Sequence, residues 1–301
     1  MPTAASIAVV LNTSSGTALG RLAMEAEIAD LFRAAGRDDV EIMTLREGQD
    51  PAGAARDAST RASVVVAAGG DGTVSSVATG IFQSQAALGI LPLGTLNHFA
   101  RDLRIPFDLA EAVATVCAGR IGPVDVGQVN DHLFVNNSSI GIYPSIVDAR
   151  EALRRQGHRK WPAMVIATAR VLRRYRGVRV TIAAGGRRRT WRSPFVFVGN
   201  NEYTIDGIGL GARATLDAGM LFVYLTPRVR ARILPILLLK ALAGHARRSG
   251  EFEIVSASEL WIETSRRRYL PVALDGEVRT MQTPLHYRAR AMALRVVLPQ
   301  V

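Results

Sequence analysis

Residues 69–73, with the sequence GGDGT, follow a strand-like apolar stretch at 64–68 and are well suited to phosphate chemistry. Glycines allow consecutive backbone N–H groups to point into one concavity, and the N-terminus of a following helix adds positive potential there. The carboxylate of Asp71 could also hold a metal ion on the phosphates. An ordinary tight turn between a strand and a helix is the alternative, but three glycines flanking an acid favour phosphate binding.

The elements that position this turn alternate between strand and helix patterns. Strands are predicted at 6–11, 40–45, 63–68 and 87–91, and helices at 18–35, 51–60, 73–82 and 109–118. In the first helix the apolar spacing uses Leu19, Leu22, Ala26, Ala29 and Phe32. Repeated βαβ units predict an α/β domain whose parallel sheet is covered by helices.

The pattern changes near 119–123, and the rest of the chain is mainly strand-like. Strands are predicted at 124–129, 133–140, 178–183 and 191–199, with a hairpin turn at Gly185-Gly186. Two insertions interrupt this pattern: a helical, very basic one at 145–176 and a mostly apolar one at 229–248. We therefore expect a nucleotide-binding type of α/β domain over 1–120 and a β-rich, antiparallel, sandwich-like domain over 121–290. The last strand, within 291–301, could rejoin the first domain.

Charge is distributed unevenly between the two halves. The chain of 301 residues has a net charge of +11, but residues 1–150 carry 10 arginines against 16 acids, and the later residues carry 27 basic residues against 10 acids. A cationic half attracts phosphates on a nucleotide, an anionic bilayer or nucleic acid. Neither lysine, Lys160 or Lys240, follows a glycine, which excludes a P-loop, and the single Cys117 excludes a disulfide framework.

Several segments resemble the diacylglycerol kinase catalytic-domain family, which includes bacterial lipid kinases and is related to sphingosine and ceramide kinases. GGDGT is shared by this family and by NAD kinases. The segments that favour the lipid-kinase branch are LNTSSG at 11–16, PLGTLNHFAR at 92–101, VDVG at 124–127 and LDGE at 274–277. Their order and spacing match the family along nearly the whole chain.

The resemblance implies a kinase that uses ATP and Mg²⁺ to phosphorylate a lipid hydroxyl, with diacylglycerol as the default acceptor and phosphatidic acid as the product. Glu277 matches the general base of the family, and Asp71 and Asp125 match acids of its metal network. A turn acid is the alternative for Glu277 if its tetrapeptide is taken alone. The nucleotide-contact positions that match are Asn12, Thr44, Gly69, Gly70, Asp71, Gly72, Thr73, Val74, Ser75 and Thr95.

Two departures from the family pattern concern metal binding. His98 stands where the family usually has an aspartate, so one acid of the Mg²⁺ network is missing. Ala218 replaces the second aspartate of a segment that binds a structural metal in relatives, whose other candidate ligands are Thr215, Asp217 and Met220. We therefore expect no complete structural metal site there, and Asp217 is interpreted as a turn or cap residue.

Two other functions remain open. NAD kinase is favoured by GGDGT and by the Asn201-Glu202 step, whereas a noncatalytic membrane-surface regulatory protein on the same fold is favoured only by His98 and Ala218. The lipid-kinase interpretation predicts a cytoplasmic protein that associates peripherally with anionic membranes through its arginines. No nucleic-acid partner is expected because no recognition motif accompanies the charge. The oligomeric state, a homodimer included, and the acceptor lipid are left open.

Overall fold

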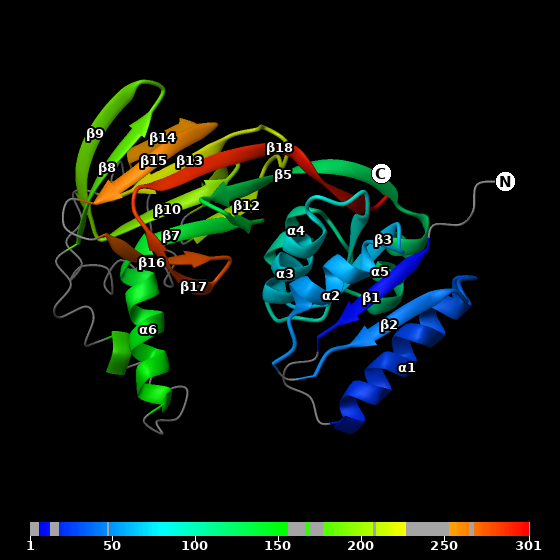
Figure 1. Cartoon of the computed structure of the whole chain (residues 1–301). Helices are drawn as coiled ribbons and strands as arrows, with labels where there is room; N and C mark the ends of the chain where they lie inside the picture. Colours follow the sequence, from blue (N-terminus) through cyan, green and yellow to red (C-terminus); the bar gives the residue numbers. More distant parts are fainter. Residues whose placement is uncertain are drawn as a thin grey trace. The chain divides into compact units, whose positions relative to one another are not determined.

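The computed structural model describes residues 6–12, 18–46, 48–155, 166–168, 177–206, 209–226, 253–264 and 268–300. The chain forms two compact units (Figure 1). Unit 1 comprises Met1–Val126 and Ala291–Val301, and unit 2 comprises Gly127–Arg290. Most of the basic insertion at 145–176 and the whole apolar insertion at 229–248 lie outside the described residues.

Unit 1 contains a parallel sheet in the order β2-β1-β3-β4. The strands are β1 (Ile7–Leu11), β2 (Val40–Thr44), β3 (Val64–Gly69) and β4 (Ala87–Pro92). Every residue of β1, β3 and β4 is buried, as expected for parallel strands covered on both faces. The end of the long strand β18 (Leu285–Leu298) runs parallel to β4, with Val296 opposite Leu88.

Four of the helices in unit 1 follow the predicted order, and the short helix α4 (His98–Asp102) was not predicted. The other four are α1 (Ala18–Ala34), α2 (Pro51–Ala58), α3 (Asp71–Ile81) and α5 (Leu109–Ala118). Carboxylates cap two of them, since Asp50 accepts from the amides of Ala52 and Gly53, and Asp108 accepts from that of Glu111.

The expected apolar face of α1 was partly wrong. Ile28 and Phe32 are fully buried, whereas Leu19 and Leu22 are exposed. Only the second half of this helix therefore packs its apolar side chains into the core. The apolar periodicity of the first half gave no sign of this difference.

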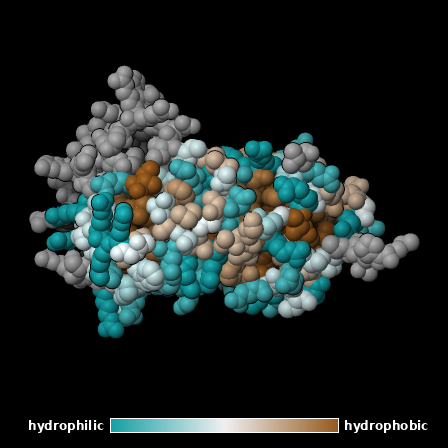
Figure 2. All heavy atoms as spheres, turned by 90° about the horizontal axis from the view of Figure 1, so that it is seen from above, coloured by the Kyte–Doolittle hydropathy of each residue, from teal (hydrophilic) through white to brown (hydrophobic). Residues whose placement is uncertain are grey.

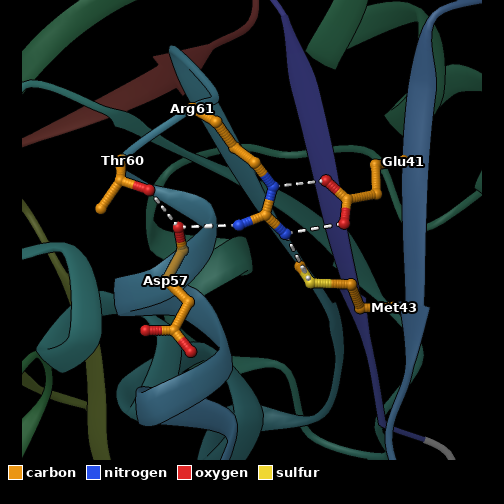
Figure 3. Close-up of polar contacts among 5 residues, drawn as sticks. All are labelled: Glu41, Met43, Asp57, Thr60 and Arg61. Atoms are coloured by element: carbon orange, nitrogen blue, oxygen red, sulfur yellow. Dashed lines mark hydrogen bonds and ion pairs between the residues drawn. The ribbon is translucent and has the colours of Figure 1, made fainter.

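One surface cluster ties the start of β3 to β2 (Figure 3). The Arg61 guanidinium donates to both oxygens of Glu41 at 2.8 and 2.7 Å, and to the carbonyl of Asp57 at 2.9 Å. This ion pair lowers the pKa of the Glu41 carboxyl mainly through the hydrogen bonds from Arg61. The cluster lies at the amino ends of the strands, away from the glycine turn, so we interpret it as structural.

Unit 2 is built from antiparallel strands. One sheet has the order β14-β13-β10-β7-β16-β17, and the start of β18 pairs with β15, which continues through β8 to β9. Strand β5 (Arg120–Val129) begins in unit 1 and continues into unit 2, where it pairs with β6. The remaining elements are β6 (His132–Phe134), β7 (Asn137–Gly141), α6 (Ile142–Arg155), β8 (Val178–Ala184), β9 (Arg187–Ser193), β10 (Phe195–Asn200), β11 (Tyr203–Asp206), β12 (Gly209–Arg213), β13 (Leu221–Leu225), β14 (Glu253–Ala257), β15 (Glu259–Thr264), β16 (Tyr269–Leu274) and β17 (Glu277–Gln282).

Side chains from both sheets of unit 2 form one buried apolar cluster. Val198 and Val272 come from one sheet, and Ile182, Ile262 and Tyr287 come from the other. This arrangement is a sandwich core. The predicted fold class, a parallel α/β domain followed by an antiparallel β domain, is confirmed.

Two predicted strands of unit 2 are each divided in the structure. The run at 133–140 is interrupted at Val135 and Asn136, whose amides bind the carboxylate of Asp275. The run at 191–199 is interrupted at Pro194, which lacks the N–H that a ladder needs. The predicted hairpin turn at Gly185-Gly186 is confirmed, with φ values of +55° and +72°.

The face in Figure 2 is mostly hydrophilic, with small hydrophobic areas between polar ones. Exposed large hydrophobic residues include Leu96, Phe107 and Tyr269. None of the helices in the described ranges is both long enough and apolar enough to cross a membrane.

Candidate functional site

The carboxyl ends of β1 to β4 place several predicted site residues along one edge of the unit 1 sheet. Leu11, the last residue of β1, lies opposite Thr44 on one side and Ala68 on the other. Asn12 follows Leu11 directly, and its backbone N–H donates to the carbonyl of Ala68 at 2.9 Å. Ligands of open α/β sheets bind beyond the carboxyl ends of the strands, so this edge is the candidate site.

The glycine turn connects β3 to α3 at this edge. Gly70 is the N-cap of α3 and supplies no side-chain oxygen to the first helical turn. The first amides of a helix have no partner within the helix, so this end is suited to an anion. A Cβ on Gly69 would lie 2.5 Å from Thr73 Oγ1, and Thr73 Oγ1 in turn accepts from Asn12 Nδ2 at 3.2 Å. Glycine is therefore required where β3 meets the helix.

A second turn, at 93–97, packs against the glycine turn. A Cβ on Gly94 would lie 2.5 Å from the Cα of Gly70. Asn97, which is buried and has a φ of +47°, holds the turn closed. Its Oδ1 accepts from the Gly94 amide at 3.1 Å, and its Nδ2 donates to the carbonyls of Gly94 and Pro92 at 2.8 and 3.2 Å.

Asp71 links the starts of two helices. It is the first residue of α3, and its Oδ1 accepts from the Phe99 amide in the first turn of α4 at 3.4 Å. His98, the first residue of α4, is exposed. The positive ends of the two helix dipoles stabilise the negative charge of the Asp71 carboxylate. The Asp71 side chain is half-buried beside the glycine turn.

The other predicted nucleotide residues have different surroundings. Thr44 Oγ1 donates to Glu25 Oε2 at 2.6 Å, and Thr95 is exposed in the second turn. Val74 is buried and its amide donates to the Gly70 carbonyl, so both its side chain and its N–H are engaged in the fold. Ser75 lies on the next position of α3 and is half-buried.

The second acid proposed for the metal network has a structural contact. Asp125 is fully buried, and its Oδ1 accepts from the amide of Met292 at 2.8 Å. Met292 has a φ of +50°, so Asp125 holds an irregular point of β18. Among the described residues, no group of three His, Cys, Asp or Glu side chains could hold a metal ion. Mg²⁺ on a nucleotide commonly needs only one or two protein carboxylates, and Asp71 fits that requirement.

The 215–220 segment, in which Ala218 replaces an acid, is held by another residue. The side-chain Oδ1 of Asn201 accepts a hydrogen bond from the backbone N–H of Ala218 at 3.1 Å. The backbone N–H of Asn201 donates to the carbonyl of Met220 at 3.0 Å. Thr215 and Asp217 are exposed. These contacts attach the segment to Asn201, which directly follows β10.

The predicted base Glu277 belongs to unit 2. It is the first residue of β17, after a two-residue turn formed by Asp275 (φ +46°) and Gly276 (φ +93°). Its side chain is 58% exposed and lies 3.5 Å from the Arg279 guanidinium. Asp275 instead accepts from three consecutive amides, those of residues 135–137, at 2.8, 2.8 and 3.0 Å. Of the two acids, Glu277 thus presents its carboxylate to solvent, whereas Asp275 anchors the turn.

The two anchoring residues, Asn97 and Asp275, were missing from the predicted site. Both carried a signal in the sequence, because Asn97 ends the Thr-x-Asn step and Asp275 begins an Asp-Gly pair typical of a tight hairpin turn. The signal indicates a turn. The partners of Asn97, Pro92 and Gly94, lie in its own turn, whereas those of Asp275 lie about 140 residues earlier in the chain, where local sequence does not reveal them.

Two family models match this chain. The diacylglycerol kinase catalytic domain matches residues 6–129. The YegS C-terminal NAD kinase beta sandwich-like domain matches residues 144–298. Together they cover both the glycine turn and the Asp275-Gly276-Glu277 turn.

Individual relatives were also found. A probable lipid kinase, YegS-like, from Pseudomonas putida is 30% identical over 241 residues, which are 78% of this chain and 77% of that protein. Diacylglycerol kinases of Bacillus subtilis and Staphylococcus saprophyticus are 36% and 33% identical, over 42% and 44% of this chain. The matched regions span only 43% and 44% of those two proteins.

A solved structure shares the fold. The crystal structure of a diacylglycerol kinase from Bacillus anthracis superposes with a TM-score of 0.69 at 20% identity. The superposition covers 97% of this chain and 96% of that one. At this identity, the likeness establishes the fold alone.

Proposed function

The chain belongs to the diacylglycerol kinase catalytic-domain family, and we propose that it transfers the γ-phosphate of ATP to the hydroxyl of a lipid. Diacylglycerol is the acceptor we propose, with phosphatidic acid as the product. The observation that carries this proposal is the glycine turn at the carboxyl edge of the sheet. It combines an uncapped helix start, a half-buried acid and a second turn packed against it.

In unit 1, the proposed role of the chain is to hold the nucleotide phosphates. The amides at the start of α3 would donate to phosphate oxygens, and Asn12 and Thr73 would border the same edge. Asp71 would hold Mg²⁺, which neutralises charge on the phosphates when it is bound. Thr44, Ser75 and Thr95 are proposed to border the nucleotide. Asp125 remains a proposed member of the metal network and also holds the backbone of β18.

In unit 2, the proposed role of Glu277 is that of general base. Its carboxylate would accept the proton of the lipid hydroxyl while the oxygen forms a bond to the γ-phosphorus. The bond between that phosphorus and the β,γ-bridging oxygen breaks, and ADP leaves. The exposed carboxylate of Glu277 and the anchored carboxylate of Asp275 support this division of roles.

An anionic lipid surface is the proposed location of the substrate. Strand β9 carries four exposed arginines, Arg187, Arg188, Arg189 and Arg192, and one of them, Arg188, pairs with Glu263. Basic residues near an anionic bilayer contribute about 1 kcal/mol each. The other arginines proposed for this role, at 154–176 and 228–248, lie almost entirely outside the described residues.

The test is transfer of radiolabelled γ-phosphate from ATP, with Mg²⁺, to diacylglycerol, sphingosine or ceramide in anionic vesicles and to NAD. We expect labelled diacylglycerol, and we expect Glu277→Gln to slow the transfer by about 10²- to 10⁴-fold. Asp131→Asn, which removes an exposed acid of the same unit, should leave the rate nearly unchanged. Labelled NAD would show a NAD kinase, and absence of transfer to every acceptor would favour the noncatalytic alternative.

A further inference from the structure

One peptide group in unit 2 lies between a buried cation and a carboxylate. The carbonyl oxygen of Val135 accepts from Arg213 Nη1 at 2.7 Å. The N–H of Asn136 belongs to the same peptide group and donates to Asp275 Oδ1 at 2.8 Å. In a trans peptide, the C=O and N–H point in opposite directions, so the cation and the carboxylate lie at opposite ends of one dipole.

Further contacts hold both ends of this bridge. Arg213 is 5% exposed, and its guanidinium also donates to Asn136 Oδ1 at 2.8 Å and to the Asn200 carbonyl at 3.2 Å. Asp275 also accepts from the amides of Val135 and Asn137, and its own amide donates to the Asn137 carbonyl at 2.9 Å. Hydrogen bonds in such a chain polarise and strengthen one another.

The carboxylate end of the bridge is two residues from Glu277. Leu274 and Glu277 form the last pair of the β16–β17 hairpin, and Leu274 also lies opposite Ser138 of β7. The position of Glu277 therefore depends on how the turn is attached to residues 135–137. Asp275 makes this attachment with three hydrogen bonds, and Arg213 fixes the same residues from the carbonyl side.

We propose that Arg213 and Asp275 are positioning residues that act as a pair through the Val135–Asn136 peptide to hold Glu277 in place for proton transfer. The proposal rests on the proposed role of Glu277. Neither residue is assigned contact with the lipid or the nucleotide. A displacement of a reacting group by about 1 Å can cost about 10²-fold in rate, so a small movement of the turn is sufficient.

The first experiment combines Asp275→Asn with Glu277→Gln. Asparagine keeps the size of the side chain but replaces one acceptor oxygen with an N–H₂ donor that faces backbone donors. We expect kcat to fall by about 10²-fold with the KM for ATP unchanged. In the Glu277→Gln background, the same change should have no further effect, because the positioned group is already absent. A further decrease there would overturn the proposal and assign Asp275 a general structural role.

The second experiment tests the coupling without an activity assay. Arg213→Lys keeps the charge but lacks the forked donors that reach the Val135 carbonyl and Asn136. We expect amide exchange at Asn136 to accelerate by at least about tenfold, relative to the buried control amide of Val223. Equal acceleration at both amides, or none at Asn136, would overturn the coupling.

The two experiments also separate this proposal from the proposed function. If Glu277→Gln retained the wild-type rate, the general-base role would be wrong and the positioning role with it. The exchange measurement would still decide whether Arg213 and Asp275 are coupled. Asp131→Asn, at an exposed acid in the β5–β6 hairpin, is the matched control and should change neither the rate nor the exchange.

Discussion

Gly70 and Gly94 lie in backbone contact, because a Cβ on Gly94 would be 2.5 Å from the Cα of Gly70. The first glycine belongs to the turn after β3 and the second to the turn after β4. Two parallel strands thus end in turns that support each other at the candidate phosphate site. A side chain at position 94 would have to displace the glycine turn itself.

We expect Gly94→Ala to weaken nucleotide binding and to lower stability by about 1–3 kcal/mol through overpacking. Gly80→Ala is the matched control, because its Cβ would meet the Ala52 carbonyl at 2.3 Å, between α2 and α3. This control should lower stability without changing the ATP affinity of the folded protein. Calorimetric titration with ATP and thermal unfolding measure the two effects. Equal loss of ATP affinity in both variants would contradict the role assigned to the turn contact.

Asp71→Asn should separate the charge of this side chain from its structural contact. The amide oxygen of asparagine can still accept from the Phe99 amide, so the melting temperature should change little. We expect the effect of Mg²⁺ on nucleotide affinity to decrease strongly, because the carboxylate is the proposed metal ligand. Titration with ADP, with and without Mg²⁺, measures this. Asp38→Asn removes an exposed acid of the same unit and should keep the full Mg²⁺ effect.

Asn97→Asp should destabilise unit 1 in a pH-dependent manner. The new carboxylate would face the carbonyls of Pro92 and Gly94 without a proton to donate, which costs about 1–3 kcal/mol. Its folded-state pKa would be raised, so stability should be retained at low pH and lost as the pH increases through that pKa. Denaturant unfolding at pH 4 and pH 7 tests this. Asn97→Ala, which cannot be protonated, should show no recovery at low pH relative to wild type.

Tyr287 should make unit 2 sensitive to alkaline pH. Its phenol is fully buried, shares a 2.9 Å hydrogen bond with Ser138 Oγ, and has its pKa raised by burial. Because the pKa is raised on folding, stability is complete below the unfolded value of about 10 and declines above it, by up to about 1.4 kcal/mol per pH unit. Unfolding at pH 8 and pH 10.5 should show a smaller decline in Tyr287→Phe than in wild type. Equal declines would assign the sensitivity to other groups.

The amino-acid sequence was sufficient to predict the order of the elements in unit 1, apart from the short helix α4. Short runs of apolar residues indicated β1, β3 and β4. The N-cap and proline at Asp50-Pro51 and the glycine turn at Gly69–Thr73 indicated where α2 and α3 begin. These signals are local, because a strand, a cap or a glycine turn is specified by residues adjacent in the chain. The predicted hairpin at Gly185-Gly186 was correct for the same reason.

Only the tertiary structure identified which turns support each other. The contact between Gly70 and Gly94 depends on β3 and β4 being neighbours, and periodicity does not determine strand order. The burial of Ile28 and Phe32 with exposure of Leu19 likewise depends on where the core lies along α1.

The division of the predicted strand at 133–140 has the same origin. The amides of Val135 and Asn136 leave the strand pattern because Asp275, about 140 residues later, accepts their hydrogen bonds. Sequence alone therefore determined the residue types and local conformations from which the site could be proposed. Only the tertiary structure determined which distant groups form hydrogen bonds with one another. A buried polar group needs a hydrogen-bond partner that is close in space, and that partner can be far away in the sequence.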